Sequence, residues 1–209
     1  MAVLEKIAFY QGRQDEVPNQ ELAKELAAAC DQIGVAEIAR NLWNENPAIQ
    51  ADCIKVMYEI GYLAPALISG YSADFLRLLT SKNNRLVWGG MIALAAIAAE
   101  CPGPILAASD RLIQAMEAGS VITVDNGVKA LAQAAAKNPS EARSVFAYLL
   151  HHLETCRAKE VPQHAESTAI AVTVENQGEF VRVLEFRLPE LSETQVRRVR
   201  KVLRDVGKR

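Results

Sequence analysis

A hydrophobic pattern that recurs about every 38 residues is the feature that most constrains the fold of this chain. Four segments stack in register: residues 48–60, 86–98, 123–135 and 162–174. One apolar column of this stack contains Val56, Leu94, Leu131 and Ile170, which are separated by 38, 37 and 39 residues. Seven positions earlier stand Ile49, Val87, Val124 and Gln163, so the first three segments keep a second apolar position on the same helical face.

The regions between these segments predict second helices. They cover residues 73–79, 105–116, 141–153 and 179–188, and a weaker opening pair covers 20–30 and 35–43. The only strand-like stretch, residues 169–174, falls where the repeat places a helix, and we interpret it as helix. A 38-residue unit of two helices is typical of an α-solenoid, in which each unit buries its apolar face against its neighbours. The sequence therefore predicts an all-α chain of about five helix pairs.

Three helix starts have recognisable capping residues. Asn46-Pro47 and Asn138-Pro139 each have the pattern of an N-cap followed by proline at the first helical position. Ser192, with Gln195 three residues later, matches the capping box and predicts the start of the last helix.

The segment from Asn84 to Ile97 resembles the second helix of a HEAT repeat. The resemblance rests on Asn84, Val87 and the Ala93-Leu94 pair, which Ala130-Leu131 repeats one unit later. It implies a right-handed α-α superhelix of the HEAT/armadillo type. We expect one domain over residues 1–209, with a degenerate N-terminal cap unit at 1–45, HEAT-like repeats at 46–175 and C-terminal capping helices at 176–209.

The sequence departs from the HEAT pattern at the position that is usually basic. Gln50, Trp88, Asp125 and His164 occupy this position, so the ladder of basic side chains found in many HEAT proteins is missing. The formal net charge is also slightly negative, at −2, which gives no overall attraction to phosphate backbones or anionic membranes. Nucleic acid is therefore disfavoured as a partner.

No targeting segment is evident at the start of the chain, and the longest uncharged apolar run, residues 86–99, is too short to span a bilayer. We expect a cytoplasmic protein with no membrane contact. The four cysteines, Cys30, Cys53, Cys101 and Cys156, have no CxxC spacing and are interpreted as buried free thiols.

One pair of residues has the spacing of metal ligands. His152 and Cys156 are one helical turn apart, and the fold could bring His164 close to them. Because no further ligand lies nearby in the sequence, the favoured interpretation is a surface histidine beside a core cysteine. We expect no metal, no cofactor and no catalytic residue, since the sequence also lacks the common hydrolase, nucleotide-binding and metalloprotease motifs.

Trp88 is followed by Gly89 and Gly90 inside a predicted helix. Two helical glycines cost roughly 1 kcal/mol each relative to alanine, so a compensating interaction is expected. Close helix–helix packing is the favoured explanation. The alternative is that the glycines leave room for a ligand beside an exposed Trp88.

A non-enzymatic interaction or scaffolding module that binds a peptide or protein on its concave face is the predicted function. The expected contact residues lie on the second helices of the repeats: Gln50, Lys55, Trp88, Asp125, Lys129, Gln133 and His164. This set is polar and mixed in charge, which suits a protein partner better than a nucleic acid. The sequence leaves the identity of the partner and the oligomeric state open.

Two alternatives rest on resemblance. Bacterial DNA alkylation-repair glycosylases are similar HEAT-like solenoids with a basic, tryptophan-bearing concave face, and bilin lyases are similar as well. Nothing in these residues indicates a tetrapyrrole. In the nucleic-acid alternative, Arg197, Arg198 and Lys201 would contact phosphates, because the last helix is amphipathic with a basic face. Capping of the solenoid is the favoured role of this helix.

Overall fold

A computed structural model describes residues 2–208 and contains only helices and connecting turns in this range. The α-helices are α1 (Val17–Ala29), α2 (Gln32–Arg40), α3 (Pro47–Leu63), α4 (Ser72–Leu78), α5 (Asn84–Ile97), α6 (Pro102–Ala107), α7 (Ser109–Glu117), α8 (Val121–Lys137), α9 (Arg143–Thr155), α10 (Val161–Thr168), α11 (Gln177–Arg187) and α12 (Glu193–Val206). Short 3₁₀ turns are η1 (Val3–Lys6), η2 (Asn41–Trp43), η3 (Pro65–Leu67), η4 (Ser69–Tyr71), η5 (Ala169–Ala171) and η6 (Leu188–Glu190).

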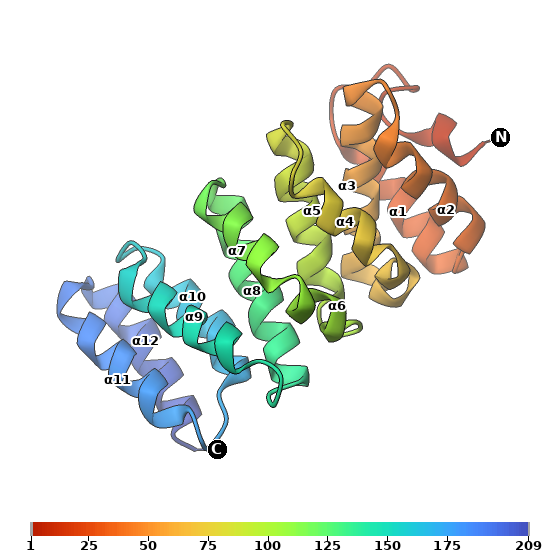
Figure 1. Ribbon diagram of the computed structural model, residues 1–209. Helices are drawn as coiled ribbons and strands as arrows, with labels where there is room; N and C mark the ends of the chain where they lie inside the picture. Colours follow the sequence, from red (N-terminus) through yellow and green to blue (C-terminus); the bar gives the residue numbers. More distant parts are fainter. Residues whose placement is uncertain (1, 209) are drawn as a thin grey trace.

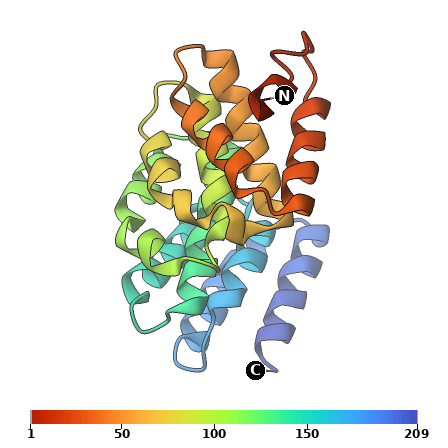
Figure 2. The same cartoon turned by 90° about the vertical axis from the view of Figure 1, so that its right-hand side faces the viewer.

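The helices form two layers that run the length of the molecule (Figure 1). One layer contains α1, α3, α5, α8, α10 and α12, each packed against the next. The other contains α2, α4, α6 with α7, α9 and α11. In Figure 2, α1 and α12 stand furthest to the right, while α5 and α8 are set back between them. The first layer therefore forms the inner, concave side. The expected all-α solenoid of about five helix pairs is confirmed.

Local capping follows the sequence at two of the three expected helix starts. The Asn46 side chain accepts a hydrogen bond from the main-chain N–H of Ala48, and Ser192 and Gln195 form a complete capping box. The prediction at Asn138 is wrong: this residue ends α8, and α9 begins only at Arg143. A short turn between the two helices takes up Pro139 and the residues after it.

Two predicted helices differ from the structure. Residues 105–116 are split at Ala108, whose N–H bonds to the carbonyls of Pro104 and Ile105 before α7 begins. Residues 169–174 are not a regular helix, because α10 ends at Thr168, η5 follows, and Val172 has an extended backbone. Apolar residues continue in the sequence beyond Thr168, where the helix ends, and this is why the sequence predicted helix over residues 169–174.

Close approach of helices explains the glycines of α5. A Cβ on Gly89 would lie 2.7 Å from Cγ1 of Ile54 on α3, and a Cβ on Gly90 would lie 3.1 Å from both Cβ of Leu78 and the carbonyl oxygen of Phe75 on α4. These distances are shorter than normal carbon contacts. The packing explanation for the two glycines is therefore confirmed.

Candidate functional site

The residues expected to contact a partner all belong to helices of the inner layer, and they differ in exposure. Lys129 on α8 is exposed, whereas Gln50, Trp88, Asp125 and Gln133 are partly buried. Trp88 packs its ring against the hydrophobic core, so it is neither free in solvent nor fully enclosed.

Lys55 is the centre of a charged cluster that connects three inner helices. Its side chain is only 7% exposed, and Nζ lies 2.8 Å from Glu16 Oε2 and 2.7 Å from Glu59 Oε1. Glu16, the N-cap residue of α1, also accepts a hydrogen bond of 3.0 Å from Arg85 on α5. Burial by itself would lower the pKa of Lys55, but its hydrogen bonds to Glu16, Glu59 and Tyr58 raise it above the ordinary value. Lys55 is thus a buried, paired cation.

An aromatic cluster lies next to this charged cluster. Tyr58 contacts Tyr62 at 6.0 Å and Trp88 at 6.1 Å between ring centroids, and Lys55 Nζ lies 4.9 Å from the Tyr58 ring. Tyr62 is 54% exposed, although it is a large aromatic residue on an inner helix. Partly exposed tyrosine and tryptophan side chains are frequent anchors in protein interfaces.

The structure places His164 in the core, with 0% of its surface exposed, whereas its neighbour Gln163 is exposed. His164 Nε2 lies 2.9 Å from Asp125 Oδ1, and His164 Nδ1 lies 3.0 Å from His152 Nε2. The expected role of His164 as an exposed contact residue therefore does not fit its position. In α10 the exposed residue is therefore Gln163, one position before the residue that the repeat alignment indicates. His164 instead connects α10 to α8 and α9 through its hydrogen bonds to Asp125 and His152.

The interpretation of His152 as a surface residue is also wrong. His152 is partly buried, stacks on Tyr148, and together with Cys156 and His164 offers three ligand atoms that all lie within 4.8 Å of one another. Burial, followed by the neighbouring His164, lowers the pKa of His152 to about 4. His152 is consequently neutral at pH 7 and carries one ring N–H.

Cysteine burial is more varied than expected. All four thiols are free, but only Cys53 is buried, while Cys101 and Cys156 are partly buried and Cys30 is exposed. Burial raises the pKa of Cys156, and the opposing effect of the Arg187 guanidinium is smaller.

Each of the three residues expected to contact phosphates in the nucleic-acid alternative has a partner within the protein, and for two of them the partner is an acidic side chain. Arg198 binds Glu166 through two hydrogen bonds of 2.9 and 2.7 Å, Lys201 lies 3.6 Å from Asp205, and Arg197 donates to the hydroxyl of Thr194. Glu166 and Asp205 offset the positive charges of Arg198 and Lys201, whereas the Thr194 hydroxyl leaves the charge of Arg197 unpaired by any acid within residues 2–208.

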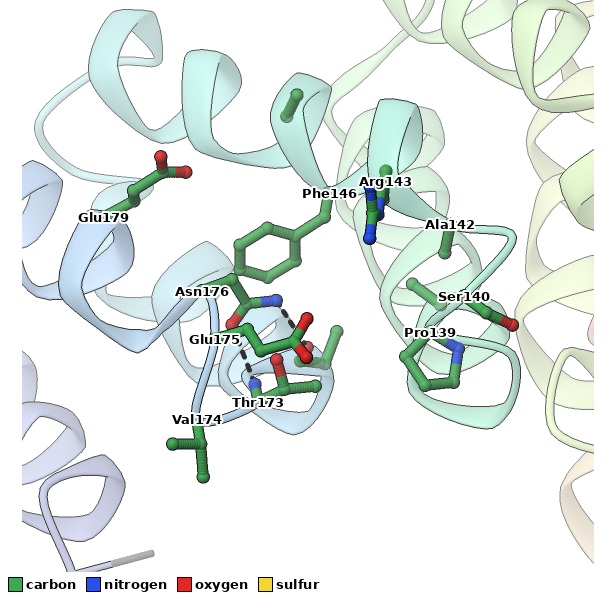
Figure 3. A pocket seen from close by; sticks show the side chains of 13 residues that line it. Pro139, Ser140, Ala142, Arg143, Phe146, Thr173, Val174, Glu175, Asn176 and Glu179 are labelled. Atoms are coloured by element: carbon green, nitrogen blue, oxygen red, sulfur yellow. Dashed lines mark hydrogen bonds between the residues drawn. The ribbon is translucent and has the colours of Figure 1, made fainter.

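A pocket of about 730 Å³ opens between α8, α9 and the segment that connects α10 to α11. In Figure 3 the Phe146 ring points toward Asn176, with Arg143 and Glu179 on either side of it. The Asn176 side chain accepts a hydrogen bond of 2.7 Å from the N–H of Thr173, which closes the turn over residues 173–176. Sequence reasoning did not find this pocket, because the connecting segment was expected to be helical.

Arg187 is a second feature that sequence reasoning did not find. Although 97% of its surface is covered, it donates hydrogen bonds to the carbonyls of Leu153 and Cys156 at the end of α9. It also pairs with Glu190 at 3.1 Å. The only sequence signal is a basic residue at the end of a helix, which is common on solvated surfaces.

Comparisons with solved structures support the architecture. An engineered protein of known crystal structure superposes with a TM-score of 0.70 at 18% identity, covering 100% of this chain and 98% of its own. A designed armadillo repeat protein in complex with the peptide (KR)4 superposes with a TM-score of 0.69 at 14% identity, covering 88% of this chain and 85% of its own. The chain has the fold of an armadillo/HEAT-like α-solenoid.

A third solenoid of this kind, computationally designed for modular peptide recognition, has a TM-score of 0.68 at 16% identity, with coverage of 88% and 85%. No protein-family model matches the solenoid, and no curated protein sequence matches it. Within residues 2–208, no helix combines the length and the apolar character needed to cross a membrane.

Proposed function

We propose that this solenoid is a non-enzymatic interaction module that binds an extended peptide segment of a partner protein along its inner face. The observation that carries the proposal is an aromatic cluster on neighbouring inner helices, in which exposed Tyr62 and partly buried Trp88 flank the buried ring of Tyr58. The half-exposed side chains of Glu16 and Arg85, which belong to the neighbouring charged cluster, would contact charged groups of the same peptide.

The fixed geometry of the cluster favours binding. Glu16 connects α1, α3 and α5 through Lys55 and Arg85, so these inner helices present their side chains at set positions. A preorganised surface loses less conformational entropy on association than a mobile one. Two solenoids of similar fold bind a peptide or were designed for peptide recognition, which supports the same use of this inner face.

A random peptide library displayed on phage, selected against the full chain, tests the proposal. Affinities of the selected peptides are then measured by fluorescence polarisation for wild type and for Tyr62→Ala. Loss of an interface hot spot costs about 2 kcal/mol or more, so the affinity should fall roughly 30-fold.

Phe186→Ala provides a matched control. Phe186 is an aromatic side chain that is 68% exposed, but it lies on α11 in the outer layer. We expect its replacement to leave the affinity unchanged. Equal affinity of the selected peptides for wild type and Tyr62→Ala would contradict binding at the aromatic cluster. Binding that depends steeply on salt and is competed by DNA would favour the nucleic-acid alternative.

A further inference from the structure

Three metal-ligating side chains converge at the junction of α9 and α10. His152 lies in the last turn of α9, Cys156 is the C-cap residue of that helix, and His164 lies on α10. We propose that His152, Cys156 and His164 form a binding site for one divalent transition-metal ion, and that zinc is the ion these ligands suit best. The proposal is independent of peptide binding on the inner face.

The chemistry of the ligands favours zinc. Two imidazole nitrogens and one thiolate sulfur are borderline-to-soft donors, which zinc prefers over the oxygen ligands that magnesium and calcium require. Bond lengths of about 2.0–2.1 Å to nitrogen and about 2.3 Å to sulfur place the ligand atoms of a tetrahedral site roughly 3.3–3.6 Å apart.

The side chains are close to this arrangement. His152 Nε2 and His164 Nδ1 are 3.0 Å apart, and the Cys156 sulfur lies within 4.8 Å of both. The imidazoles need to separate by a few tenths of an ångström, and rotation of the Cys156 side chain brings the sulfur about 1 Å closer to the nitrogens.

Asp125 on α8 orients one of the ligands. Its carboxylate accepts a hydrogen bond of 2.9 Å from His164 Nε2, so Nδ1 of the same ring is left as the nitrogen that faces His152. A carboxylate that holds the far nitrogen of a histidine is a common feature of zinc sites, where it fixes the tautomer and the ring orientation. Asp125 is therefore a positioning residue rather than a ligand.

Arg187 holds the third ligand in place. It donates a hydrogen bond of 2.7 Å to the carbonyl of Cys156 and another to the carbonyl of Leu153, so the end of α9 has a defined course. The Cys156 sulfhydryl makes a long contact of 3.9 Å to the Leu153 carbonyl and also interacts with the Arg187 guanidinium, and metal binding would replace its contact to the carbonyl. The guanidinium also places a positive charge near the thiolate that metal binding creates.

Metal binding releases one proton to solvent, from the Cys156 thiol. The hydrogen that His152 Nε2 donates to His164 Nδ1 in the metal-free chain moves to Nδ1 of the His152 ring. The thiolate sulfur, His152 Nε2 and His164 Nδ1 then each provide an electron pair. Water completes the fourth position. No electron transfer is involved. The bound ion connects α9 of the outer layer to α10 of the inner layer, and Asp125 extends this connection to α8.

Cobalt(II) titration of the full chain, after treatment with a chelator, tests the site directly. A thiolate ligand produces a charge-transfer band in the near ultraviolet, and tetrahedral cobalt produces strong visible bands. We expect both bands to saturate at one cobalt per chain and to disappear when zinc is added. If the wild-type protein shows no such bands, Asp125, His164 and His152 form only a hydrogen-bond network, and the proposal is wrong.

Variants assign the ligands, with far-ultraviolet circular dichroism as a check on folding. Cys156→Ser should abolish the charge-transfer band, and Asp125→Asn should keep the band but weaken affinity about 10- to 100-fold. Two control variants should change neither the charge-transfer band nor the affinity for cobalt. They are Cys101→Ser, at another partly buried thiol, and His151→Gln, at an exposed histidine of α9. A band that persists in folded Cys156→Ser, or that is lost in Cys101→Ser, would place the metal elsewhere.

Discussion

Replacing Gly89 with alanine tests whether this position sets the distance between α3 and α5. A Cβ at Gly89 would lie 2.7 Å from Cγ1 and 3.2 Å from Cγ2 of Ile54, which is fully buried. Ile54 is β-branched and has one strongly preferred side-chain rotamer in a helix, so rotation does not move both γ-carbons away. The two helices must therefore move apart.

The expected loss of stability combines two opposing effects. Overpacking of a filled core costs about 1–3 kcal/mol, while the change from glycine to alanine inside a helix contributes about 1 kcal/mol in the stabilising direction. Gly89→Ala should thus lower the free energy of unfolding by about 1 kcal/mol. At Gly178 on α11 nothing lies within 4 Å of the place where a methyl group would be added, so Gly178→Ala should stabilise the chain by up to about 1 kcal/mol.

Urea denaturation, followed by circular dichroism and by tryptophan fluorescence, measures both variants. A double-mutant cycle with Ile54→Ala adds a direct test, because removal of both γ-carbons makes room for the new methyl group. The double variant should lose about 0.5–3 kcal/mol less stability than the sum of the single variants. The packing argument is refuted if Gly89→Ala is as stable as wild type, or if the two changes are additive.

Three further predictions concern buried charges and thiols. Arg187→Met should lower the free energy of unfolding by about 3 kcal/mol in urea denaturation, because two main-chain carbonyls lose their donor, and a loss below about 1 kcal/mol would contradict this. In the native chain, maleimide should modify exposed Cys30 first and reach buried Cys53 only after unfolding, as peptide mass mapping would show; early labelling of Cys53 would contradict its burial. Because the pKa of Lys55 is raised in the folded chain, its stabilising contribution is complete below the unfolded-chain pKa of about 10.4 and is lost as the pH rises above that value. Wild type should therefore lose more stability than Lys55→Met between about pH 10 and pH 12 in urea denaturation, and equal losses would contradict this.

The repeat architecture could be predicted from the order of residues without any structure. Apolar residues at helical spacing, repeated about every 38 positions, can be buried only if consecutive helix pairs stack on one another. Val56, Leu94 and Leu131 are accordingly fully buried, but Ile170, the fourth residue of the column, is 44% exposed because α10 ends at Thr168. The helix starts at Asn46 and Ser192 were also predictable, because an N-cap hydrogen bond forms between residues two or three positions apart.

Which polar side chains meet depends on how the helices pack. Glu16 and Arg85 are 69 positions apart, and Asp125 and His164 are 39 apart, yet each pair forms a hydrogen bond. A sequence pattern can misplace the buried face of a helix by one residue, and one residue turns a side chain by about 100° around the helix axis. In α10 this difference decides which side chain is buried, because His164 lies in the core and Gln163 lies at the surface.

The candidate sites depend on these long-range contacts. The aromatic cluster requires α3 to pack beside α5, and the ligand cluster requires α9 to fold back onto α10. Sequence spacing indicated one pair of the ligand cluster, His152 and Cys156, which are one turn apart on the same helix, and named His164 only as a residue that the fold could bring close. The third ligand and its carboxylate partner come from other helices, and the packing of the repeats brings them within bonding distance.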